Sequence, residues 1–187
     1  MGIDFYVYAF NPPIDSSDMQ PEIWVELASI IEDRYDRYDG FVILHGSDTM
    51  AFTASALSFM LENLSKPVIL TGSQLPIGKI RTDAKENIIT AMEIACSRHN
   101  GSDVSMVPEV CIYFDFSLFR GNRAKKYNAE KFEAFYSMNY HRLAEAGIDI
   151  KFRPQFMLPT PTAPLKVHKD LETNITVLKL FPGITRS

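Results

Sequence analysis

The sequence predicts an α/β domain of Rossmann-like, three-layer architecture, with a mostly parallel sheet and helices on both faces. Three observations predict it. Short apolar runs alternate with longer amphipathic segments, which is typical of βα units. The chain has 187 residues, of which 46% are hydrophobic, so one domain can bury a sizeable core. Residues 41–44 are all apolar, as in a parallel strand that is covered on both faces.

The first elements follow from composition and turn residues. Residues 5–10 are aromatic and apolar and predict a strand. Residues 11–19 are rich in Pro, Asp and Ser and predict a loop. Pro21 is well placed in the first turn of a helix, and apolar residues at helical spacing extend that helix to about residue 38.

Two strand–loop–helix units are expected next. After the strand at 41–44, residues 45–49 form a turn and residues 50–64 a helix. Residues 67–70 form the next strand, and residues 71–76 the loop that follows it. In the remaining chain we expect a helix over 83–97, a strand over 110–114, a glycine-closed helix end at 143–147, strands over 148–152 and 176–181, and a loop with four prolines over 154–164.

Three polar loops mark the expected binding site. Ligands of an open parallel sheet bind outside the carboxyl ends of its strands, and the loops expected there are rich in hydroxyls and carboxylates. A simpler interpretation is helix capping, since Ser and Asp favour helix N-termini. Capping explains one such loop more readily than three. The loops are Asp15-Ser16-Ser17-Asp18, His45-Gly46-Ser47-Asp48-Thr49 and Thr71-Gly72-Ser73-Gln74.

Lys126 is the candidate base. It ends a basic segment, residues 120–126, which for an arbitrary sequence is more simply a solvated turn. If Lys126 reaches the strand ends and loses part of its solvation, it can take a proton from a hydroxyl. Ser47 would then be the nucleophile and Asp48 the anion that orients the lysine. His45 also titrates near neutrality, but its place at a strand end beside a glycine favours a structural role.

Composition excludes several classes of function. The net charge is −4 and the basic residues are scattered, so no basic stripe for nucleic acid is present. We find neither a membrane-spanning run nor a signal peptide, which indicates a cytoplasmic protein. The two cysteines and four histidines lack metal-ligand spacing, so no metal site is expected.

Four stretches resemble the L-asparaginase family, in the family's order and over nearly the whole chain. The most specific is Asp39-Gly40-Phe41-Val42-Ile43-Leu44-His45-Gly46-Ser47-Asp48-Thr49-Met50, which is similar to a family signature. The others are Asp15-Ser16-Ser17-Asp18-Met19, Lys66-Pro67-Val68-Ile69-Leu70-Thr71-Gly72-Ser73-Gln74-Leu75-Pro76 and Arg120-Gly121-Asn122-Arg123. The first of these, with the run SALSFMLENL, looks most like the type I, cytoplasmic branch.

The resemblance implies hydrolysis of L-asparagine to L-aspartate and ammonia by a homodimer or homotetramer without a cofactor. It gives catalytic roles to Ser47, Asp48 and Lys126, Asp48 also binding the substrate's amino group. Asp15 and Ser16 would bind the substrate's α-carboxylate and amino end. The backbone carbonyl of Ser73 would contact the side-chain amide.

The chain also departs from the family pattern. Ser47 stands where the family has threonine, and serine lacks the methyl group that restricts the rotamer. The family's Thr-Gly-Gly-Thr-Ile strand and its carboxyl-terminal domain are not found. We therefore expect residues 1–187 to be an amino-terminal asparaginase domain, incomplete at its N-terminus, with little activity alone. Loss of the first strand would leave an unpaired sheet edge.

Two alternatives stay open. One is a relative that acts on another amide, either glutamine or a misacylated tRNA, although the acidic balance argues against tRNA. The other is a non-catalytic ligand-binding or interaction domain that retains the pocket. Such a domain would still bind aspartate.

Overall fold

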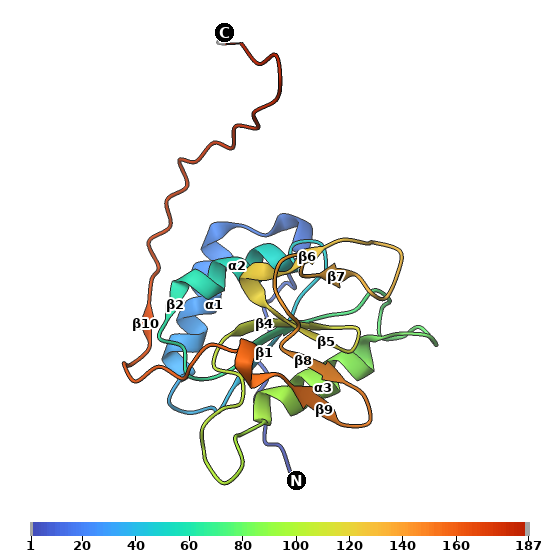
Figure 1. Ribbon diagram of the computed structural model, residues 1–187, viewed down its shortest axis with the longest axis vertical. Coiled ribbons are helices and arrows are strands. Elements are labelled where there is room, and N and C mark those ends of the chain that lie inside the picture. The colour runs from blue at the N-terminus through green and yellow to red at the C-terminus, as the bar shows by residue number, and fades with distance from the viewer. Residues whose placement is uncertain (1, 186–187) are drawn as a thin grey trace.

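The computed structural model describes residues 2–185, which form a six-stranded sheet with helices on both faces (Figure 1). The strand order is β1-β3-β4-β5-β8-β9. The strands are β1 (Phe41–Leu44), β3 (Val68–Thr71), β4 (Val110–Phe114), β5 (Ser117–Arg120), β8 (Ala144–Ala146) and β9 (Ile150–Phe152).

The sheet is mixed, so the prediction of a mostly parallel sheet is wrong. β1, β3 and β4 run parallel, whereas β5, β8 and β9 each run antiparallel to the strand before them. The change of direction occurs in a two-residue turn between β4 and β5. Asp115 and Phe116 occupy this turn with φ angles of 44° and 59°. Two successive positive φ angles match the tight hairpin turn that the twist of antiparallel strands favours.

The three long helices divide between the two faces. α1 (Pro21–Arg34) and α2 (Met50–Met60) lie on one face, and α3 (Ala84–Cys96) lies on the other (Figure 1). Alternation along β3 separates the two cores, because Val68 and Leu70 pack with α2 whereas Ile69 packs with α3. The helices expected to begin at residues 21, 50 and 83 are confirmed, although α1 and α2 each end four residues earlier than predicted.

Shorter elements complete the domain. α2 leads directly into β2 (Leu61–Glu62), which pairs with β10 (Lys166–Val167). A second small ribbon joins β6 (Lys125–Lys126) to β7 (Phe135–Tyr136). Three 3₁₀ turns are η1 (Ser16–Asp18), η2 (Gly121–Arg123) and η3 (Pro154–Phe156).

Three local predictions are wrong. Residues 5–10 and 176–181 are extended but have no ladder partner among residues 2–185. The first segment contacts α1 through its aromatic rings, since the Arg34 guanidinium lies over both Tyr6 and Tyr8. The second extends away from the domain (Figure 1). The predicted helix end at 143–147 is strand β8, because Leu143 and Ala144 are buried in the core that contains α3.

Candidate active site

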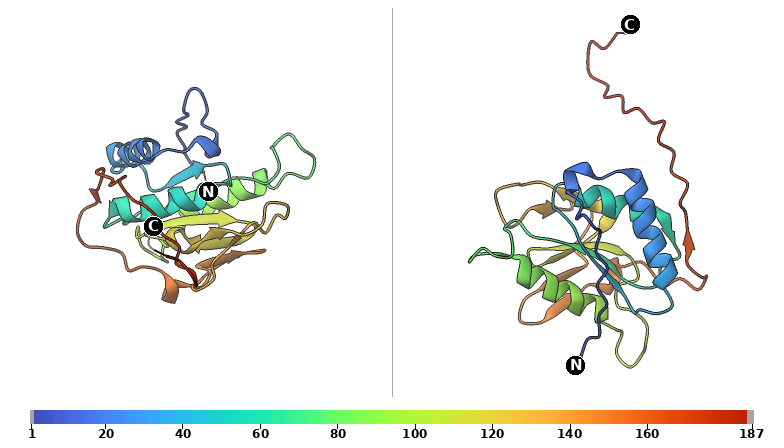
Figure 2. Two further views of the ribbon diagram at one scale, coloured as in Figure 1. Left: turned by 90° about the horizontal axis from the view of Figure 1, so that it is seen from above. Right: turned by 180° about the vertical axis from the view of Figure 1, so that it is seen from behind.

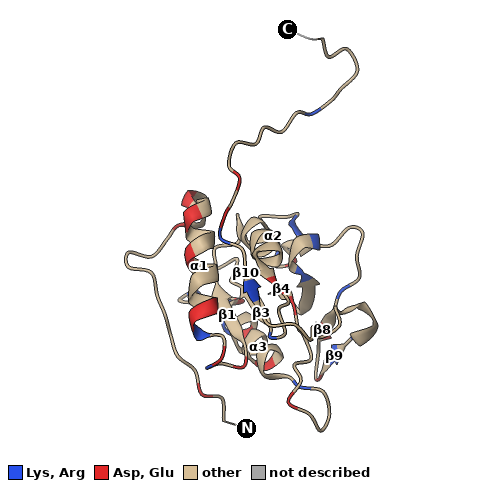
Figure 3. Cartoon of the chain, turned by 90° about the vertical axis from the view of Figure 1, so that its left-hand side faces the viewer, with Lys and Arg blue, Asp and Glu red and all other residues tan. Residues whose placement is uncertain are grey.

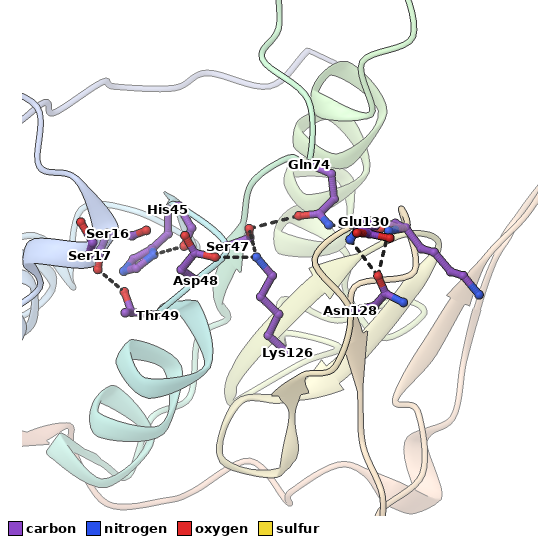
Figure 4. A network of polar contacts seen from close by, with 12 residues as sticks. Ser16, Ser17, His45, Ser47, Asp48, Thr49, Gln74, Lys126, Asn128 and Glu130 are labelled. Carbon is purple, nitrogen blue, oxygen red and sulfur yellow. Dashed lines mark hydrogen bonds and ion pairs between the residues drawn. The ribbon is translucent and has the colours of Figure 1, made fainter.

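Ser47, Asp48 and Lys126 lie in direct contact (Figure 4). The Lys126 ammonium donates to Ser47 Oγ at 2.8 Å and to Asp48 Oδ1 at 2.6 Å. The Lys126 side chain is 17% exposed, whereas that of Asp48 is 71% exposed. The lysine is therefore largely enclosed, and the carboxylate of Asp48 remains open to a ligand.

The loop between β1 and α2 presents Ser47 and Asp48. Thr49 is the N-cap residue of α2, but its side chain does not cap the helix. Instead Thr49 Oγ1 donates to the carbonyl of Ser16 at 2.6 Å. Ser47 and Asp48 also point to partners outside the helix, so the capping interpretation fails for this loop.

Lys126 reaches the site through a segment that packs against α2. β5 carries the chain to the opposite end of the sheet from the site, and η2 then packs against α2. Gly121 makes this packing possible, because an added Cβ would lie 3.0 Å from Val110 O and 3.1 Å from Ala54 O. From there the chain runs back along α2 into β6, which ends at Lys126.

The loop of Asp15 and Ser16 lies against the same turn. A Cβ added to Gly46 would lie 2.4 Å from Ser16 Oγ, so only glycine allows this approach. Asp15 Oδ1 accepts hydrogen bonds from the backbone N–H and the hydroxyl of Ser17, both at 2.9 Å. These donors stabilise the carboxylate and lower the pKa of Asp15. The carboxylate thus caps η1, whereas α1 has Gln20 as its N-cap residue and no side-chain cap, so Ser16 and Ser17 do not cap that helix.

The third loop adds a residue that sequence analysis missed. Gln74 follows Ser73 after β3, and its Oε1 accepts a hydrogen bond from Ser47 Oγ at 3.1 Å (Figure 4). Its Nε2 donates to the carbonyl of Lys131 at 2.9 Å. Ser73 lies in the same loop beside Gln74, at the carboxyl end of β3. The three predicted loops therefore meet near the carboxyl ends of β1 and β3.

Two residues near the start of α3 hold this loop, and both escaped sequence analysis. The Asp83 carboxylate accepts from the backbone N–H groups of Gln74 and Leu75, at 3.0 to 3.2 Å. Asn87 is 1% exposed, and its Nδ2 donates to Gly72 O at 2.9 Å. The available signal was the spacing, since residues 83 and 87 share one face of a helix and that face meets the third loop.

His45 lies in a hydrogen-bonded chain rather than in the ion pair. The Trp24 indole donates to Thr53 Oγ1 at 3.0 Å, and Thr53 Oγ1 lies 2.9 Å from His45 Nε2. His45 Nδ1 lies 2.7 Å from Gly46 O, which can only accept, so Nδ1 carries the proton. Burial disfavours the imidazolium and lowers the pKa of His45. These contacts support the structural role.

Known proteins resemble this chain in sequence and in fold. The family model described as "Asparaginase, N-terminal" matches residues 3–157. The chain belongs to the asparaginase family. It is 47% identical to L-asparaginase 1 of Escherichia coli (strain K12), over 97% of this chain and 52% of that protein. The crystal structure of L-asparaginase I from Vibrio cholerae superposes with a TM-score of 0.86 at 44% identity, over 97% of this chain and 53% of that chain.

Another relative carries a different name. The chain is 45% identical to the mouse protein named 60 kDa lysophospholipase, over 99% of this chain and 32% of that protein. The chain thus spans about half the length of the bacterial asparaginases and about a third of this longer relative. Both alignments extend over nearly the whole of this chain.

The charge distribution agrees with the expectation from composition. Acidic residues gather on α1, and Lys and Arg are scattered over the side of the molecule that Figure 3 presents. No helix within residues 2–185 is long and apolar enough to cross a membrane. Figure 2 shows the segment that follows β10 directed away from the sheet and helices.

Proposed function

We propose that this chain supplies the amino-terminal domain of an amidohydrolase that converts L-asparagine to L-aspartate and ammonia. The observation that carries the proposal is the contact of one largely enclosed lysine with both a hydroxyl and a carboxylate. Lys126 Nζ lies 2.8 Å from Ser47 Oγ and 2.6 Å from Asp48 Oδ1. A hydroxyl nucleophile, its base and an orienting anion are the groups that acyl transfer needs.

The reaction would proceed in two stages. Lys126, once it has lost a proton, accepts the Ser47 proton while Ser47 Oγ bonds to the amide carbon of the substrate. The lysine then passes that proton to the departing nitrogen, the C–N bond breaks, and ammonia leaves. Water cleaves the resulting ester by the reverse proton path, which releases L-aspartate and restores the Ser47 hydroxyl.

The same edge of the sheet offers groups for the rest of the substrate. The exposed Asp48 carboxylate would bind the α-ammonium, and Asp15 and Ser16 would hold the α-carboxylate and the amino end. Asp15 Oδ1 already accepts from the backbone N–H and the hydroxyl of Ser17, so this anion suits the amino end of the substrate rather than its carboxylate. The backbone carbonyl of Ser73 would accept from the side-chain amide.

We infer that turnover also requires the part of the enzyme that this chain does not span. The chain covers 52% of the E. coli enzyme, and residues 1–187 would correspond to part of that enzyme's amino-terminal domain. β1 has no strand on its outer edge within the described residues, which leaves room for another strand. The assembled enzyme would be a cytoplasmic homodimer or homotetramer.

The test measures ammonia release from L-asparagine by two proteins. One is this chain, and the other is this chain extended at both ends with the corresponding segments of the E. coli enzyme. We expect turnover in the extended protein and little or none in the chain alone. In the extended protein, Ser47→Ala and Lys126→Met should each lower kcat by about 100-fold or more, the scale of general base catalysis. Lys125→Met is the matched control, because Lys125 is the exposed neighbour in β6.

The alternatives give different results in the same assay. Faster turnover of glutamine would identify a glutaminase, and hydrolysis of a lysophospholipid would identify an esterase like the relative named lysophospholipase. If the extended protein folds and binds L-aspartate but releases no ammonia, the catalytic assignment is wrong. The domain would then be a ligand-binding module.

A further inference from the structure

The Ser47 hydroxyl is held from two sides, and only one of its partners is a catalytic candidate. An ammonium can only donate, so Ser47 Oγ accepts from Lys126 at 2.8 Å. The Ser47 proton is therefore free for another acceptor, and it points to Gln74 Oε1 at 3.1 Å. These two contacts fix the direction of both the oxygen lone pair and the proton.

Gln74 is itself fixed at several points. A carbonyl accepts only, so the contact with Lys131 O at 2.9 Å identifies the nitrogen of the Gln74 amide and directs Oε1 toward Ser47. The Gln74 backbone N–H is bonded to both oxygens of the Asp83 carboxylate, at 3.1 and 3.0 Å. The Gln74 amide thus connects two partners: its oxygen contacts the Ser47 hydroxyl, and its nitrogen contacts Lys131 in the segment that follows β6.

Serine needs such a restraint more than a β-branched residue does. Its side chain can occupy three staggered rotamers, and no methyl group on Cβ excludes any of them. Only a rotamer that keeps Oγ beside Lys126 allows the lysine to accept its proton. A net hydrogen bond of ordinary strength shifts an equilibrium of this kind by about fivefold.

We propose that Gln74 is a positioning residue that holds the Ser47 hydroxyl in the rotamer facing Lys126. This inference deepens the proposed function and depends on it for its catalytic meaning. Gln74 acts through Ser47, and its amide takes no part in bond making or breaking. If Gln74 is removed, the rotamer facing Lys126 should lose this fivefold factor relative to the other two wells, and only the contact with Lys126 remains to favour it.

The test is made on this chain by NMR, with labelled serine, from the Hα–Hβ couplings of Ser47. The wild-type couplings should report one dominant rotamer, and those of Gln74→Met and Gln74→Ala should move toward the average of three. Gln155→Met is the matched control, because Gln155 is exposed and lies in η3. Unchanged Ser47 couplings in folded Gln74→Met and Gln74→Ala would overturn the proposal.

The catalytic consequence is measured separately in the extended protein. Gln74→Met should lower kcat by up to about fivefold with little change in KM. The loss should vanish in a Ser47→Thr background, because the β-branch of threonine restricts the rotamer by itself. An equal loss in both backgrounds would show that Gln74 acts on the substrate instead and would overturn the proposal. No asparagine turnover in any extended form would refute the proposed function, while the couplings still decide the role of Gln74.

Discussion

Replacing Thr53 by valine should destabilise the domain and loosen the loop that carries Ser47. Thr53 is fully buried, and its hydroxyl accepts from the Trp24 indole at 3.0 Å and lies 2.9 Å from His45 Nε2. Valine has nearly the same shape but leaves the Trp24 N–H and His45 Nε2 without their hydrogen-bond partner. A buried polar group that loses its partner costs about 1–3 kcal/mol. Because Trp24 and His45 are only half-buried, we expect a total of about 2–4 kcal/mol.

Thr53→Ser is the matched control, because it keeps the hydroxyl and loses only a methyl group, at about 1 kcal/mol. Urea unfolding, followed by the fluorescence of the single tryptophan and by circular dichroism, measures both variants. The valine variant should be less stable than the serine variant by about 1–3 kcal/mol. If the valine variant is as stable as the serine variant or more stable, the series of hydrogen bonds from Trp24 through Thr53 and His45 to Gly46 does not stabilise the loop.

Three further outcomes are expected. Burial places the pKa of His45 below its ordinary value of 6.5, so the unfolded state takes up that proton first as the pH falls. The contribution is complete above pH 6.5 and is lost below it as the pH approaches the folded pKa, and His45→Gln should flatten this part of the stability profile. Gly46→Ala should abolish L-aspartate binding, measured by calorimetry, because its added Cβ would lie 2.4 Å from Ser16 Oγ. Gly147→Ala is the control and should leave binding unchanged, because its Cβ would lie 3.8 Å from the nearest atom. Arg120→Met should lower the free energy of unfolding by about 3–5 kcal/mol, because it leaves the buried Glu109 carboxylate, which is 3% exposed, without its cation. Urea unfolding measures this loss, and Arg120→Lys, which keeps a cation, should lose less.

The strand–loop–helix units could be predicted because their information is local. The apolar run at 41–44 and the helices that begin at Pro21 and Met50 each follow from residues close in sequence. The hairpin between β4 and β5 could not be predicted in this way. Asp115-Phe116 is not one of the glycine-containing pairs that mark such turns, and a phenylalanine with positive φ is rare. Missing this turn made the sheet look more parallel than it is.

The two wrong strands have a common physical reason. Residues 5–10 and 176–181 have the composition of strands, but a strand is stabilised by hydrogen bonds to a neighbour. Within residues 2–185 neither segment has a neighbouring strand. Composition thus predicted the extended backbone correctly but could not supply the pairing.

The prediction of the site was more successful for the loops than for their contacts. Hydroxyls and carboxylates at the expected loop positions predicted Ser47, Asp48 and Ser16 together, and these loops do meet. The sequence gives Gln74 no role of its own, because no local pattern shows that its amide reaches Ser47. A contact over 27 residues depends on how β1 and β3 pair, and periodicity does not give that register.

The mixed sheet explains how Lys126 joins residues that precede it by 78 and 79 positions. In a purely parallel sheet, a crossover helix would follow β4 and the next polar loop would come after another strand. Here the tight hairpin sends the chain back along β5, and Gly121 allows η2 to pass closely over α2. The segment that continues to β6 therefore returns along α2 to the end of the sheet where Ser47 lies. The antiparallel strand that sequence analysis missed is thus the element that brings the base to its nucleophile.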